Sequence, residues 1–191
     1  MLFRSVLDYA VRDHRLSFEL WDVLTQLSFT TLVAFLVFGW SFRAQLGVSV
    51  GLLLVTEVLY RFTGIPGFDQ PFTDQHNFGN WMDLVLMNKI NSGGWVAINC
   101  IPTAAHTIWG AMAGKILLGK DSSDKKIRML VIGGAVLLLA GYGLDWTSVT
   151  PIIKRIATSS FTLASGGWCL LALTVFWWLM DGARSEEHTS E

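Results

Sequence analysis

Apolar residues are gathered into long runs that are separated by short polar connections. Five runs approach the length of about 20 residues that an α-helix needs to cross a bilayer. They are Val23–Trp40, Ala44–Tyr60, Trp95–Leu118, Ile127–Leu144 and Thr158–Met180. Only a few residues around 41–43 separate the first two runs, which predicts an antiparallel helical hairpin. We therefore expect an all-α fold, a polytopic transmembrane bundle of about five helices.

One connection is far longer than the others and runs from Arg61 to Gly94. It contains Pro66, Gly67 and Pro71 together with several carboxylate and amide side chains. Segments of this length inside a compact protein usually carry function or fold on their own. We therefore expect a folded external loop beside a site.

The composition agrees with a membrane protein. Hydrophobic residues make up 52% of the chain and charged residues 15%, against about 25% charged in ordinary soluble domains. The mean hydropathy is +0.46, so we expect membrane lipid as a partner. The net charge of −1 offers no basic surface for nucleic acid. Cys100 and Cys169 lie in apolar runs without metal-ligand spacing, and we interpret both as small core residues.

The distribution of lysine and arginine predicts an orientation. A basic cluster follows the third apolar run and consists of Lys115, Lys120, Lys125, Lys126 and Arg128. The positive-inside rule assigns such a cluster to the cytoplasm. We therefore expect loop 119–126 to be cytoplasmic and loop 61–94 to be external.

The two ends of the chain resemble peptides that would be encoded by the adapter DNA used in sequencing. Residues 184–191, Arg-Ser-Glu-Glu-His-Thr-Ser-Glu, are what a common adapter string encodes, and residues 1–5 match its complementary end. We interpret both as non-native and expect one partial transmembrane domain at residues 6–183. A short native start and a polar native tail are the alternative.

A polar stripe marks the third apolar run. Asn99, Thr103, His106, Gly110 and Gly114 recur at steps of three and four residues, so they share one helical face. An imidazole inside a membrane can act as a general base, a general acid or a hydrogen-bond anchor. It can equally be a packed residue bonded to a neighbouring helix, and the glycine pair indicates close helix packing.

The long connection offers a second group of polar side chains. Asp69, Asn80 and Asp83 lie near Trp81, and carboxylates, amides and an aromatic platform together suit a sugar. A solvated loop of the same composition is the alternative. The spacings match no established metal site, so we expect no metal.

A third group precedes the last apolar run. Lys154 and Arg155 could contact an anionic cofactor, and Ser160 belongs to a hydroxyl-rich helix start. Interfacial cations also commonly extend to lipid headgroups without further function. Glu57 and Arg61 are explained by an ion pair one helical turn apart.

Four segments in order resemble the bacterial branch of the heparan-α-glucosaminide N-acetyltransferase family, relatives of the YeiB/NagX-type membrane acyltransferases. The segments are Pro66–Phe72, His76–Leu84, Ile101–Lys115 and Pro151–Phe161. The resemblance covers most of Leu16–Asp181. The sequence departs from the lysosomal branch at Ser92-Gly93-Gly94-Trp95, where that branch has Asp-Pro-Glu-Gly, and at Ile153, where an Asn is usual.

The resemblance implies transfer of an acetyl group from cytoplasmic acetyl-CoA, the co-substrate, to the amino group of a terminal glucosamine or related sugar outside. It implies a bacterial inner membrane, a larger bundle and a catalytic His in an upstream external loop. We therefore assign no catalytic residue here and expect the fragment itself to be inactive. The acetyl path would be lined by Asn99, Thr103, His106, Lys154 and Ser160.

Two other classes of protein fit the same pattern. A transporter or permease fragment would use the polar stripe to pass a solute, and a non-catalytic membrane scaffold would use it to hold helices together. Acetyl-CoA binding, solute flux, or neither would distinguish the three. The sequence leaves a homo-oligomeric assembly open.

Overall fold

The computed structural model describes residues 19–188, with side chains up to residue 180. The end segments 1–5 and 189–191 lie outside the described residues, and of 184–188 only the backbone of the last helix is described. The elements are α2 (Val23–Val37), α3 (Phe42–Phe62), α4 (Phe78–Met87), η1 (Ala97–Asn99), α5 (Cys100–Leu118), α6 (Ser123–Trp146) and α7 (Ser159–His188). No strand occurs in this part of the chain, so the all-α prediction is confirmed.

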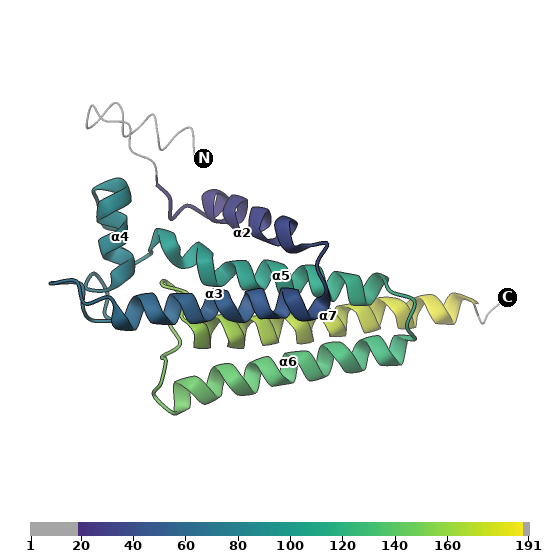
Figure 1. The fold of residues 1–191 in the computed structure, drawn as a ribbon. Coiled ribbons are helices and arrows are strands. Elements are labelled where there is room, and N and C mark those ends of the chain that lie inside the picture. The colour runs from purple at the N-terminus through teal and green to yellow at the C-terminus, as the bar shows by residue number, and fades with distance from the viewer. Residues whose placement is uncertain (1–18, 189–191) are drawn as a thin grey trace.

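Helix α5 lies at the centre of a lengthwise bundle. It packs against α2, α3 and α7, while α6 packs mainly against α7 (Figure 1). The buried positions of α5 include Ala104, Ala105 and Ile108, whose small or aliphatic side chains let neighbouring helices approach. The elements α2 and α3 run in opposite directions as predicted, but each packs on α5 more than on the other.

Three helices are long and apolar enough to cross a membrane: Phe42–Phe62, Ser123–Trp146 and Ser159–Met180. They correspond to three of the predicted spans, and α2 is a shorter apolar helix of 15 residues. Helix α5 has 19 residues but is not in this group, because its polar stripe lowers its hydropathy. Large apolar side chains such as Phe35 and Leu139 are exposed on the outside of the bundle. The chain is therefore an integral membrane protein.

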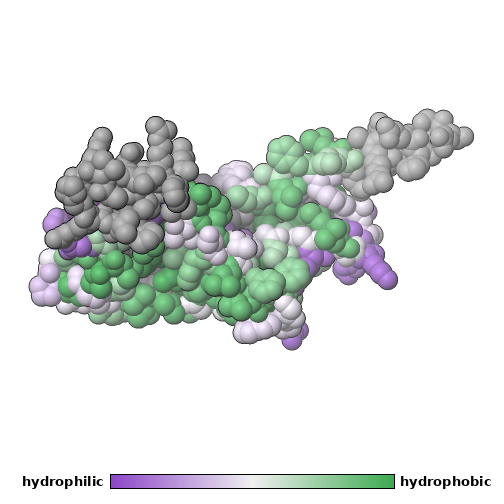
Figure 2. Space-filling view, turned by 90° about the horizontal axis from the view of Figure 1, so that it is seen from above, coloured by the Kyte–Doolittle hydropathy of each residue, from purple (hydrophilic) through white to green (hydrophobic). Residues whose placement is uncertain are grey.

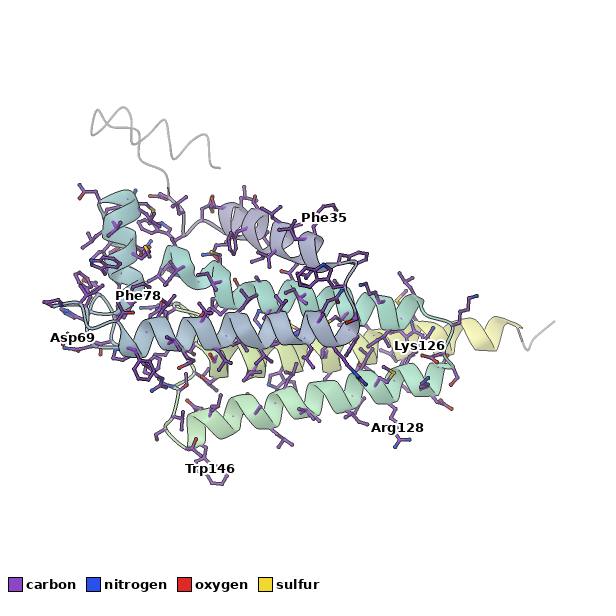
Figure 3. The ribbon with its side chains drawn as sticks, viewed as in Figure 1. Phe35, Asp69, Phe78, Lys126, Arg128 and Trp146 are labelled. Atoms are coloured by element: carbon purple, nitrogen blue, oxygen red, sulfur yellow. The ribbon has the colours of Figure 1, made fainter. Side chains whose placement is uncertain are left out.

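The surface has the polarity that a bilayer requires. Hydrophobic residues cover most of the visible middle, and hydrophilic residues gather towards the two ends (Figure 2). We call the end that carries α4 the α4 end, and the opposite end, which carries the 119–122 turn, the basic end. Asp69 marks the α4 end, and Lys126 and Arg128 mark the basic end (Figure 3).

The third span begins later than its apolar run predicts. We expected a helix from Trp95, but residues 97–99 form the short 3₁₀ element η1 and the α-helix begins at Cys100. Pro102 lies in the first turn of α5, where its missing N–H needs no helical partner. Val96 has an extended backbone, with φ −124° and ψ 145°, so the helix does not continue backwards to Trp95.

The expected close packing of Gly110 and Gly114 is wrong for the described residues. A Cβ atom at either glycine would have no neighbour within 4 Å among them. The close glycine contacts lie instead between α6 and α7, where a Cβ at Gly141 would lie 2.5 Å from the backbone N of Ala164. The thiol-bearing Cys169 is exposed rather than in the core, since it lies on the outer face of α7, where lipid accepts a small apolar side chain.

Candidate functional site

The long connection and the α6–α7 loop meet at the α4 end. Helix α4 runs across this end of the bundle rather than along it (Figure 1). The side chain of Asn77 caps α4 by accepting from the N–H of Asn80. The long connection is therefore a folded segment, as expected. A pocket of about 360 Å³ lies between it and residues 152–156 of the α6–α7 loop, and we call it the polar pocket.

Charged groups of both signs line the polar pocket. Arg155 Nη1 lies 3.8 Å from Asp74 Oδ2, so one wall carries a cation and the other a carboxylate. Lys154 Nζ lies 5.7 Å from the centre of the Trp95 ring, within range of a cation–π contact. Both basic side chains are exposed. The pocket can therefore offer donors, an acceptor and a larger apolar surface, made by Phe72, Ile152, Ile153 and Ile156.

Gly94 allows the long connection to close on itself beside the pocket. Its φ is +74°, in the left-handed region that favours glycine, and a Cβ there would lie 2.5 Å from Asp74 Oδ1. A larger residue would therefore push Asp74 away. Gly94, which lies where the sequence departs from the lysosomal pattern, therefore has a structural role in this wall.

Arg61 holds the α6–α7 loop in place beside the pocket. It forms the expected ion pair with Glu57 at 2.8 Å. Its Nη2 also donates to the backbone oxygen of Val149 and to Thr150 Oγ1, the latter at 2.9 Å. The guanidinium lies 4.9 Å from the centre of the Phe72 ring. Arg61 therefore links α3, the α6–α7 loop and the long connection, which the sequence did not reveal.

Ser160 shapes the α6–α7 loop from beneath. Its hydroxyl is buried and donates to the carbonyl of Pro151 at 2.8 Å, and Thr158 donates to the same oxygen at 2.7 Å. Thr158 also accepts from the N–H of Ile153. In this structure Ser160 thus positions residues 151–153 rather than facing a path.

The two predicted sugar contacts on α4 are buried beneath the α4 end. Asn80 and Asp83 both have 0% of their surface exposed, whereas Asp69 is exposed at the tip of the long connection (Figure 3). Asp83 Oδ1 accepts from the backbone N–H of Ala97 at 2.9 Å. In this conformation Asp69 is accessible to a sugar and the other two are not.

Tyr60 joins these residues in a buried polar cluster, which we define as Tyr60, Asn80 and Asp83. The Tyr60 hydroxyl lies against Gly79 and is close enough to Asp83 to interact with its charge. Among the described residues, the Tyr60 hydroxyl, the Asn80 side chain and Asp83 Oδ2 have no hydrogen-bond partner. Burial raises the pKa of Asp83 to about 7, and the Ala97 hydrogen bond opposes this only in part. Tyr60 was missed because it ends an apolar run.

His106 connects α5 to α7. Its Nε2 lies 2.7 Å from the backbone oxygen of Thr162, and because a carbonyl can only accept, Nε2 carries the proton and donates. Ser165 Oγ lies 3.1 Å from the same nitrogen, and its own hydroxyl donates to Phe161. In the neutral ring Nδ1 is then the basic nitrogen. These contacts match the alternative interpretation, in which His106 is a packed residue bonded to a neighbouring helix.

The remaining stripe residues also make local contacts. Asn99 Nδ2 donates to the backbone oxygen of Arg155 at 3.3 Å, which ties the start of α5 to the pocket wall. Thr103 donates to the backbone of its own helix at 2.8 Å. Asn99 Oδ1 has no partner among the described residues. Of the five predicted path residues, Lys154 lines the polar pocket, and Asn99 and Ser160 bond to the backbone of the loop that forms its wall. His106 lies at the α5–α7 contact, and Thr103 bonds within its own helix.

Fold and site together define an α-helical integral membrane protein with a polar pocket at one end of its bundle. Neither the known family models, nor the curated proteins, nor the solved structures include a match to this chain.

Proposed function

We propose that the chain is part of a multi-pass membrane acetyltransferase that moves an acetyl group from cytoplasmic acetyl-CoA to the amino group of a glucosamine or related sugar outside. The proposal rests on which sequence segments form the walls of the polar pocket. Seven of its nine lining residues come from three of the four segments that resemble the N-acetyltransferase family, Pro66–Phe72, His76–Leu84 and Pro151–Phe161, while Asp74 and Gly94 lie outside them. Segments far apart in the sequence therefore contribute to one binding space.

The pocket has the size and chemistry for a sugar acceptor. Its volume of about 360 Å³ lies at the lower end of the range for small-molecule sites, roughly 300–1,000 Å³. Asp74 can accept hydrogen bonds from sugar hydroxyls or attract the amine, while Lys154 and Arg155 can donate. Phe72 offers a ring against the apolar face of a sugar.

The proposed sidedness follows from the charges at the two ends. Within residues 19–180, the basic end carries six Lys or Arg residues and the α4 end carries four. Arg12 and Arg15, which precede the first span, would make the totals equal, so the sidedness rests on the clustering of the six rather than on the totals. The six are Arg43, Lys115, Lys120, Lys125, Lys126 and Arg128, and the four are Arg61, Lys89, Lys154 and Arg155. The positive-inside rule then puts loop 119–126 in the cytoplasm and the polar pocket outside, in a bacterial inner membrane.

This sidedness changes the role proposed for Lys154. Lys154 lines the polar pocket at the α4 end, opposite the basic cluster that would meet the anionic nucleotide of cytoplasmic acetyl-CoA. We therefore assign Lys154 to the acceptor side. In the transfer itself the amine would attack the thioester carbonyl, a C–N bond would form and the C–S bond would break. No residue of this chain is assigned as the base.

The proposal is tested by acceptor binding and by acetyl transfer. Glucosamine should bind the purified protein in detergent micelles, and Arg155→Gln and Asp74→Asn should each weaken binding several-fold, because each removes a charged pocket contact. Lys120→Gln at the basic end is the control. Because the resemblance implies a catalytic His upstream of this chain, acetyl transfer would be measured in membranes containing the complete protein, with labelled acetyl-CoA supplied on the cytoplasmic side. Solute flux without acetyl transfer would instead support a permease, and absence of binding, flux and transfer would support a scaffold.

A further inference from the structure

A second, apolar space lies away from the polar pocket, between α3 and α6. The two helices make little direct contact, and α5 and α7 form the floor between them. The cleft has a volume of about 260 Å³. Its lining residues are all apolar and include Leu46, Trp109, Ile116, Gly133, Val136 and Leu170. We call it the apolar cleft.

The apolar cleft lies at membrane depth. Its two walls, α3 and α6, are among the helices long and apolar enough to span a bilayer. Leu46 and Val136 line the cleft and are also exposed at its edges, so the cleft is open to the lipid side of the bundle. An open cleft without a partner leaves its lining atoms short of van der Waals contacts. The apolar chains that surround such a surface in a membrane are lipid acyl chains.

Each wall of the cleft ends in a cation at the basic end. Arg43 lies three residues before Leu46, and Lys126 lies four residues before Leu130, so each shares a helix face with a lining residue. Arg43 is exposed and has no carboxylate partner among the described residues. Lys126 Nζ donates to the backbone oxygen of Leu117 at 2.8 Å and lies 5.7 Å from the centre of the Trp177 ring of α7, also without a carboxylate partner among the described residues.

We propose that the apolar cleft binds one acyl chain of an anionic phospholipid whose phosphate headgroup lies between Arg43 and Lys126. Apolar lining at membrane depth selects the acyl chain, and two cations at the membrane boundary select the anionic headgroup. The site is separate from the polar pocket and does not depend on the acetyltransferase proposal. It would make anionic lipid a bound component of the folded protein.

Native mass spectrometry of the protein in mild detergent tests the site. We expect more adducts with phosphatidylglycerol than with phosphatidylcholine of identical acyl chains. The double variant Arg43→Gln/Lys126→Gln should lower phosphatidylglycerol affinity by about fivefold for each cation removed and leave phosphatidylcholine unchanged. The matched control is Lys120→Gln/Arg128→Gln, which removes the same charge from the same end. The side chain of Arg128 points away from the bundle (Figure 3).

A second variant tests the cleft itself. A Cβ at Gly133 would meet only Leu170 Cδ1, at an ordinary 3.7 Å, so Gly133→Leu should fold and fill the space. It should reduce adducts of both lipids. Equal binding of the two lipids to the native sequence, or equal losses in the two double variants, would overturn the proposal. So would a dimer that Gly133→Leu dissociates, since a second copy would then occupy the cleft.

Discussion

Asp83 is a buried carboxyl whose ionisation should control the stability of the α4 end. Its pKa in the folded protein is raised to about 7, so the folded state holds its proton more tightly than the unfolded chain does. The stabilisation that the protonated Asp83 gives the folded state is complete below about pH 4 and is lost as the pH rises to about 7. Above about pH 7 it does not change further. Asp83→Asn should therefore flatten this pH dependence and raise the thermal midpoint above pH 7, measured by unfolding in detergent between pH 4 and 8.

The design of this substitution depends on the Ala97 contact. Asparagine keeps an oxygen that can accept from the Ala97 N–H, whereas Asp83→Ala removes it and leaves that N–H buried without a partner. We expect Asp83→Ala to be destabilised at every pH. Tyr60 is the titratable neighbour from α3, and Tyr60→Phe should leave the transition near pH 7 in place. An unchanged pH profile in Asp83→Asn would assign the transition to another group.

His106 offers a second prediction at the scale of single residues. Removing the donor to Thr162 with His106→Ala should cost about 1 kcal/mol of stability, as for other hydrogen bonds between membrane helices. Thermal unfolding in detergent measures the effect, with Thr107→Ala on the same helix as control. Unchanged stability together with reduced acetyl transfer by the complete enzyme would instead assign His106 to the acetyl path.

At the scale of elements, two glycines on different helices should respond in opposite directions to alanine. A Cβ at Gly141 would lie 2.5 Å from Ala164 N and 2.8 Å from Ser160 O, both backbone atoms, so α6 and α7 must separate. We expect Gly141→Ala to cost about 1–3 kcal/mol. Gly110→Ala meets no described atom within 4 Å and should stabilise α5 by up to about 1 kcal/mol. Chemical or thermal unfolding of both variants measures these changes in stability. A loss of stability in Gly110→Ala would show that a partner outside the described residues covers Gly110.

The same two glycines show what could be predicted from the sequence. Hydropathy predicted the α6 and α7 spans within a few residues, because burial in lipid depends on the composition of the helix itself. The face that each helix turns to a neighbour depends on the other helices. A glycine spacing on α5 therefore suggested close packing that the structure has on α6 and α7 instead.

The candidate site was predicted only in part for the same reason. Asn80 and Asp83 were identified by residue type, but their burial follows from α4 lying across the bundle and could not be deduced from the sequence. The meeting of Arg155 with Asp74, and of Arg61 with Thr150, joins segments more than 80 positions apart. Such contacts depend on topology, which hydropathy does not specify.

At the scale of the whole molecule, the orientation in the membrane can be tested directly. We expect Asp69→Cys, at the exposed tip of the α4 end, to react with a membrane-impermeant maleimide in intact cells. Ser122→Cys, in the turn at the basic end, should react only after permeabilisation, because the proposed sidedness has the cationic cluster of that end in the cytoplasm. Both substitutions are made with Cys100 and Cys169 replaced by alanine. The reverse labelling pattern would invert the proposed sidedness.

The contact between α5 and α7 also bears on how the protein is made. His106 and Thr162 are 56 positions apart, so α5 leaves the ribosome well before its hydrogen-bond partner exists. At that stage α5 carries an imidazole without a partner, and its own hydropathy is lower than that of the other long helices. Stable insertion of α5 therefore depends on the later arrival of α7. A nascent chain halted before residue 159 would leave the central helix of the bundle without the partner that makes its polar face acceptable to lipid.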